Sequence, residues 1–231
     1  MSLLTRPLKQ RLWQRFGTAA HPAEWDGLVF GGGKISQRFW EYFKVIEYLD
    51  VADGARVLDI GGGSPTTGVS FFPQLLASFP GLHVGVLDTQ FGAAAGLPEN
   101  VELIRGLADR EVLEAVIRSF RPTHISCISV MEHARPAQQR GVFEAVEAAF
   151  QGECLAMTLE FHEVVAFNNN HDVDDGHRFM VTNTQSLSDM VAPLSRYFLD
   201  AIDSAPVRCV NGYDGLQPLW RPLALRFLPS T

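Results

Sequence analysis

The sequence predicts an α/β fold in which one doubly wound, mostly parallel sheet is covered by helices. From about residue 55 onward, short β-branched or apolar runs alternate with helical patterns, which is typical of strand–helix–strand units. The run 57–60 has the composition of a buried strand, and Gly61, Gly62 and Gly63 follow it directly. Such a glycine turn lets a ligand approach the backbone closely, as at nucleotide-binding corners.

The length and charge of the chain indicate its domain organisation and exclude some classes of partner. With 231 residues the chain suffices for one domain, and we expect residues 1–50 to form a helical cap on residues 51–231. Acidic residues outnumber basic ones, 26 to 19, and no dense basic run occurs, which disfavours nucleic acid and anionic membranes as partners. Three scattered cysteines and the lack of an apolar signal segment predict reduced thiols in a cytoplasmic protein: Cys127, Cys154 and Cys209.

Hydrophobic periodicity predicts the individual elements. The expected helices are 3–16, 35–49, 71–79, 111–120, 136–149 and 184–194, and the expected strands are 57–60, 83–87, 101–105, 123–130, 153–161, 197–202 and 223–227. A helix is also expected to begin near Thr66, and Pro73 belongs in the first turn of the 71–79 helix. In the 35–49 helix the aromatic residues form a core stripe, whereas Arg38 and Glu41, together with Lys34 before it, are the polar residues that could face a site.

The glycine turn differs from a dinucleotide fingerprint. The third glycine of that fingerprint is replaced by Thr66, and Pro65 removes an N–H that a pyrophosphate could use. Asp59 would repel a pyrophosphate and attract a cation. The string VLDIGGG, residues 57–63, resembles motif I of the class I S-adenosylmethionine-dependent methyltransferases. That resemblance implies a seven-stranded sheet with an antiparallel last strand, and S-adenosylmethionine as a cofactor whose cationic groups suit an acidic corner.

The same resemblance implies further cofactor contacts. Asp88 ends the next strand, 25 residues beyond Gly63, where a carboxylate can accept both ribose hydroxyls; its alternative role is to cap a loop. Asp109 resembles the residue that accepts the adenine amino group, and its alternative role is a helix N-cap. The string SVMEHA, residues 129–134, resembles the motif after strand four of this family. The cofactor residues implied are Asp59, Gly61, Gly62, Gly63, Asp88, Thr89, Asp109 and Val130.

His133 is the candidate catalytic residue. An imidazole can accept a proton from an acceptor hydroxyl near neutral pH. Some members of the family with E-x-x-E-H at this place hold a divalent metal, but Ser129 stands here where the first glutamate would be. His162 could complete a metal site with Glu132 and His133, and a structural or substrate-orienting role is the third possibility.

We therefore expect a methyltransferase that acts on a small polar acceptor, at a hydroxyl oxygen, as a monomer or homodimer. The polar segment 168–178, rich in Asn, Asp and His, is expected to contact that acceptor. Two alternatives belong to other classes: a non-catalytic cofactor-binding or scaffold protein of this fold, and a nicotinamide-dependent oxidoreductase.

Overall fold

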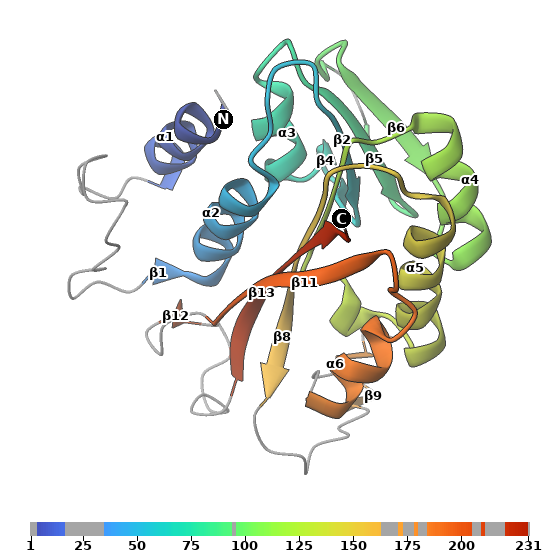
Figure 1. Ribbon diagram of the computed structural model, residues 1–231. Coiled ribbons are helices and arrows are strands. Elements are labelled where there is room, and N and C mark those ends of the chain that lie inside the picture. The colour runs from blue at the N-terminus through green and yellow to red at the C-terminus, as the bar shows by residue number, and fades with distance from the viewer. Residues whose placement is uncertain are drawn as a thin grey trace.

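The computed structural model describes residues 4–16, 35–93, 96–162, 171–172, 178–179, 184–204, 209–210 and 220–230. A seven-stranded sheet lies at its centre, in the order β11-β13-β8-β7-β2-β5-β6 (Figure 1). β13 pairs antiparallel with both of its neighbours, and the other pairings of this sheet are parallel. The sequence-based prediction of the sheet is thereby confirmed. The strands are β2 Arg56–Ile60, β5 His83–Asp88, β6 Val101–Arg105, β7 His124–Ile128, β8 Cys154–His162, β11 Tyr197–Ser204 and β13 Trp220–Pro229.

Helices cover both faces of the sheet (Figure 1). One face carries α1 Thr5–Phe16, α2 Gln37–Leu49 and α3 Phe71–Ala77, and the other carries α4 Arg110–Phe120, α5 Pro136–Ala149 and α6 Thr184–Val191. Each layer has its own apolar core. Along β2, Val57 packs into the core under α2, while Leu58 and Ile60 pack into the core under α4 and α5. No helix in the described ranges is long and apolar enough to cross a membrane.

The chain order of the strands creates a point at which two connections diverge. From β2 the chain proceeds outward to β5 and β6, and it then returns to β7 on the other side of β2. In open α/β sheets, ligands bind at the carboxyl ends of the strands where such a reversal occurs. The loops that follow β2, β5 and β7 are therefore the place to look for a site.

Short pairings complete the described structure. β1 Ile35–Ser36 runs parallel to β12 Cys209–Val210, and β9 His171–Asp172 runs antiparallel to β10 Arg178–Phe179. Apart from these short strands, the polar segment 168–178 lies outside the described residues. A 3-10 turn, η2 Met131–His133, follows β7.

The expected helix near Thr66 is wrong. β3 Gly63–Ser64 and β4 Gly68–Val69 form a short antiparallel hairpin there. The Ser64 hydroxyl accepts a hydrogen bond from the N–H of Thr67 at 3.2 Å, and Gly68 has φ +79, so the backbone turns back on itself. Such side-chain bonds to nearby backbone compete with helix formation. The helix α3 begins only at Phe71, with Pro73 in its first turn as predicted.

Candidate functional site

The turn after β2 has room only for glycine. Gly61 has φ +78, and a Cβ atom there would lie 2.3 Å from Cγ2 of Val130. A Cβ at Gly62 would lie 2.0 Å from Oδ2 of Asp59, and one at Gly63 would lie 2.3 Å from the carbonyl oxygen of Gln90. The turn thus brings bare backbone to the carboxyl edge of the sheet, as its sequence indicated.

Asp88 connects the end of β5 to this turn. Its Oδ2 accepts a hydrogen bond from the N–H of Gly63 at 2.9 Å, and its Oδ1 accepts one from the N–H of Gln90 at 2.9 Å. A carboxylate oxygen accepts more than one hydrogen bond, so Asp88 can cap its loop and still accept hydroxyl groups of a ligand. The two roles that the sequence left open are therefore compatible.

Asp59 lies beneath the turn rather than on the surface of the site. Its side chain is buried, and Ser126 Oγ donates a hydrogen bond to Oδ1 at 2.5 Å. The pKa of Asp59 is raised to about 7, mainly by burial; the hydrogen bond from Ser126 opposes this rise, and the negative charge of Asp88 adds to it. A cation bound near this turn would favour the ionised carboxylate.

A cavity of about 220 Å³ opens between the ends of β2, β5, β6 and β7. It includes five of the predicted site residues: Gly61, Asp88, Thr89, Val130 and His133. Gly62 and Gly63 continue the turn beside it. Much of the remaining cavity wall follows β6 or lies on α5, and no sequence motif indicated it. These lining residues are Gly106, Leu107, Ala108 and Gln138, together with Ile60, Leu87, Met131 and Ala134.

Asp109 lies at the start of α4, directly after the cavity-lining residue Ala108. It is the N-cap of α4, where its Oδ1 accepts the N–H of Val112 at 2.9 Å, and it is not part of the cavity wall. The hydrogen bond favours the capping alternative. The signal that would have located the wall is the end of β6 itself, since residues that directly follow a parallel strand reach the ligand edge.

The turn after β7 carries the candidate catalytic residue. Glu132 is buried, whereas His133 is exposed and lines the cavity. Within the described ranges no group of three His, Cys, Asp or Glu side chains is arranged to hold a metal ion. The backbone of His162 ends β8, but its side chain lies outside the described residues.

A scan against protein-family models gives no match, and a search of curated proteins by sequence gives none either. Many solved structures are similar, however. The [4+2]-cyclase SpnF superposes with a TM-score of 0.64 at 11% identity, over 99% of this chain and 93% of that one.

Two methyltransferases are also similar. A SAM-dependent methyltransferase from Anabaena variabilis gives a TM-score of 0.53 at 10% identity, over 76% of this chain and 77% of that one. Geranyl diphosphate C-methyltransferase from Streptomyces coelicolor, solved with Mg²⁺, geranyl diphosphate and S-adenosyl-L-homocysteine, gives 0.56 at 8% identity, over 82% and 78%. This is the class I methyltransferase fold.

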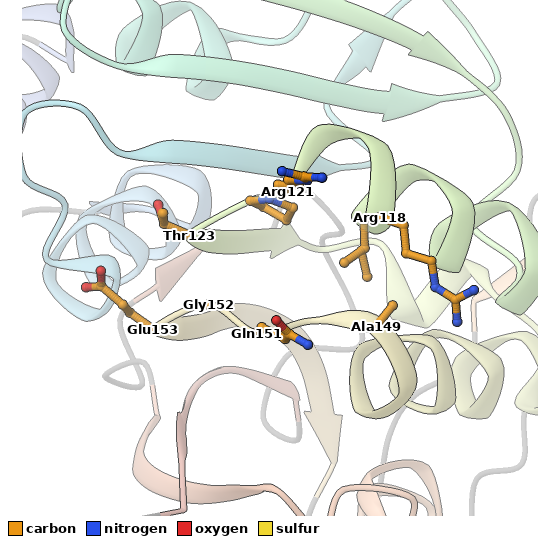
Figure 2. A pocket seen from close by; sticks show the side chains of 9 residues that line it. Arg118, Arg121, Thr123, Ala149, Gln151, Gly152 and Glu153 are labelled. Atoms are coloured by element: carbon orange, nitrogen blue, oxygen red, sulfur yellow. The ribbon is translucent and has the colours of Figure 1, made fainter.

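The methyltransferase fold of this chain has a second, larger cavity at the opposite edge of the sheet. It measures about 530 Å³ and lies between the ends of α4 and α5, at the amino ends of β7 and β8 (Figure 2). Arg118 on its rim is paired with Glu114 at 2.9 Å. Size alone does not make it the better candidate, because ligands of open α/β folds bind at the carboxyl ends of the strands.

Proposed function

We propose that this protein is an S-adenosylmethionine-dependent methyltransferase that acts at a hydroxyl oxygen of a small polar acceptor. The observation that carries the proposal is the Asp88 carboxylate, bonded to the N–H of Gly63 across the edge of a cavity that glycine backbone leaves open. The fold of the neighbours supports it, although a fold alone does not fix a reaction.

The residues present fit this cofactor. Asp88 would accept the ribose hydroxyls, and the apolar side chains of Leu87, Leu107 and Val130 would contact the adenine ring. Asp59 would balance the positive charge. The cavity of about 220 Å³ is smaller than the typical range of about 300–1,000 Å³ for small-molecule sites. We therefore propose that it takes the nucleoside part, and that the amino-acid part lies along the turn 61–63.

When bound, the cofactor supplies a methyl group activated by a sulfonium. The protein must then orient the acceptor and take up the proton of its hydroxyl. His133 is suited to that step because it is exposed at the cavity.

Cys127 and Cys154 are buried free thiols, which supports a reducing, cytoplasmic location for the enzyme.

Calorimetric titration of the wild-type protein with S-adenosylhomocysteine, NAD and NADP tests this proposal. We expect binding of S-adenosylhomocysteine alone. Binding of NAD without S-adenosylhomocysteine would establish a nicotinamide enzyme instead. Cofactor binding without methylation of any acceptor would favour a scaffold or an enzyme of another reaction class, and the similarity to a [4+2]-cyclase makes that outcome worth testing.

Asp88→Ala is expected to weaken binding of S-adenosylhomocysteine at least about tenfold, since hydrogen bonds to a charged group contribute about 1.5–3 kcal/mol each. Titration calorimetry measures the change. Glu102→Ala is the control, because Glu102 is an exposed carboxylate on neighbouring β6. The affinity of this variant for S-adenosylhomocysteine should stay within about twofold of the wild type. An unchanged dissociation constant for Asp88→Ala would restrict Asp88 to capping its loop.

The raised pKa of Asp59 predicts that both stability and cofactor binding depend on pH. Its pKa is 3.8 in an unstructured chain and about 7 here, so between these values the folded protein holds a proton that the unfolded chain has released. The contribution of Asp59 to stability therefore falls as pH rises from about 4 to 7. A bound ammonium group favours the ionised form, so affinity for S-adenosylhomocysteine should increase as pH rises toward 7.

Proton release measures this linkage. Titration at pH 6 in two buffers of different ionisation enthalpy should show a proton released on binding, and Asp59→Asn should release none. Equal heats in both buffers for the wild-type protein would show that the Asp59 carboxyl does not respond to the ligand.

A further inference from the structure

The turn after β7 begins with a residue in an unfavourable conformation. Ser129 has φ +50, in the left-handed region that is rare for residues other than glycine, asparagine and aspartate. Its N–H donates to the carbonyl oxygen and to Oγ1 of Thr158 on β8, at 3.1 and 3.2 Å. This conformation ends β7 at Ile128, two residues before the sequence pattern predicted. Something in the fold must stabilise the turn.

A buried carboxylate from α2 makes that contact. Ser129 Oγ donates a hydrogen bond of 2.5 Å to Oε1 of Glu41, a residue 88 positions earlier in the chain. Glu41 is 0% exposed, and its Oε2 accepts a hydrogen bond of 3.0 Å from Nη1 of Arg38. A buried carboxylate is costly unless its oxygens are hydrogen-bonded, and both oxygens are bonded here. The interaction therefore fixes the relative positions of α2 and the turn.

The turn after β7 also shapes the cavity. Val130, Met131 and His133 line the cavity. Val130 also packs against the glycine turn, because a Cβ at Gly61 would lie only 2.3 Å from its Cγ2. A rotation at Ser129 would move this wall and the imidazole of His133 together.

We propose that Glu41 is a positioning residue: through Ser129 it holds residues 130–133 where they form one wall of the cofactor cavity and present His133 to the acceptor. The inference rests on the proposed function for its consequences, but the contact itself exists without any ligand.

The alternative is that the bond only docks α2 on the sheet, and a matched control exists on the same helix. Tyr48 Oη donates a hydrogen bond of 2.7 Å to Oδ2 of Asp203 on β11, three strands away from β7. Tyr48→Phe removes one hydrogen bond of α2, as Ser129→Ala does, without touching the turn after β7. Both variants should lower the thermal midpoint.

Only Ser129→Ala should disturb the site. We expect it to weaken S-adenosylhomocysteine binding at least about fivefold and to speed hydrogen–deuterium exchange of amides 130–134 in the ligand-free protein by a similar factor. Tyr48→Phe should leave both within about twofold of the wild type. The positioning role is refuted if Ser129→Ala lowers the thermal midpoint but leaves the amide exchange rates and the affinity for S-adenosylhomocysteine within about twofold of the wild type.

Two further variants test the cause. Ser129→Gly should bind S-adenosylhomocysteine more tightly than Ser129→Ala, because glycine adopts φ +50 without cost. Glu41→Gln combined with Ser129→Ala should be no worse than the weaker-binding single variant, since both changes break one interaction. Additive losses, or a glycine variant as weak as the alanine variant, would contradict the proposal. If the wild type binds no S-adenosylhomocysteine, the proposed function fails, and the exchange rates still decide the positioning role.

Discussion

Gly61→Val is expected to abolish measurable binding of S-adenosylhomocysteine. A valine there would have to adopt φ +78, which costs about 1–2 kcal/mol for an L-residue. Its Cβ would also lie 2.3 Å from Cγ2 of Val130, so the turn or the cavity wall must shift. Strain and obstruction together should lower the affinity at least about a hundredfold. Titration calorimetry measures the affinity, and circular dichroism shows whether the sheet still forms.

Gly54→Val separates these two causes. Gly54 has φ +85, nearly the value at Gly61, but a Cβ there would have no atom within 4 Å. It lies in the turn that precedes β2, at the other edge of the sheet. Gly54→Val should therefore lose stability through backbone strain alone and keep the affinity for S-adenosylhomocysteine within about twofold of the wild type. Binding by Gly61→Val within tenfold of the wild type would show that the ligand does not approach this turn.

Local patterns were enough to predict much of the fold. The helix 136–149 was predicted to the residue because Pro136 marks its first position and its apolar residues recur at helical spacing. Strand 101–105 was likewise exact. The strand–glycine corner could be predicted because its sequence requirement is steric and lies within a few consecutive residues. These elements depend on interactions close in sequence, which a single sequence displays.

The features that were missed depend on interactions distant in sequence or on very short pairings. The hairpin of β3 and β4 has only two residues in each strand, too few for any alternation pattern. Asp109 fitted both a helix cap and a cofactor contact, and only its bond to Val112 favours the cap. Glu41 on α2 is fully buried and bonded to Ser129, which lies 88 positions later in the chain. Sequence spacing could name Glu41 as a residue that might face a site, but not its partner.

His133→Ala is expected to lower kcat by about 10²–10⁴-fold, the usual contribution of a general base, with a hydroxylated acceptor that the wild-type protein methylates. The affinity for S-adenosylhomocysteine should stay within about twofold, because His133 is exposed at the cavity rather than buried under the glycine turn. The wild-type rate should rise with pH as the general base loses its proton, and the variant should lose that dependence.

His83→Ala is the matched control for this base, because His83 is also exposed but begins β5, at the edge of the sheet away from the cavity. The kcat of His83→Ala should be unchanged.

A chelator distinguishes the remaining roles of His133. Wild-type activity that is lost with chelator and restored by magnesium, manganese or zinc would assign His133 to a metal site. Full activity of His133→Ala would leave it a structural role only. A large fall in kcat that is indifferent to chelator and removes the pH dependence is the result that a general base requires, since an orienting residue would affect KM without abolishing the titration.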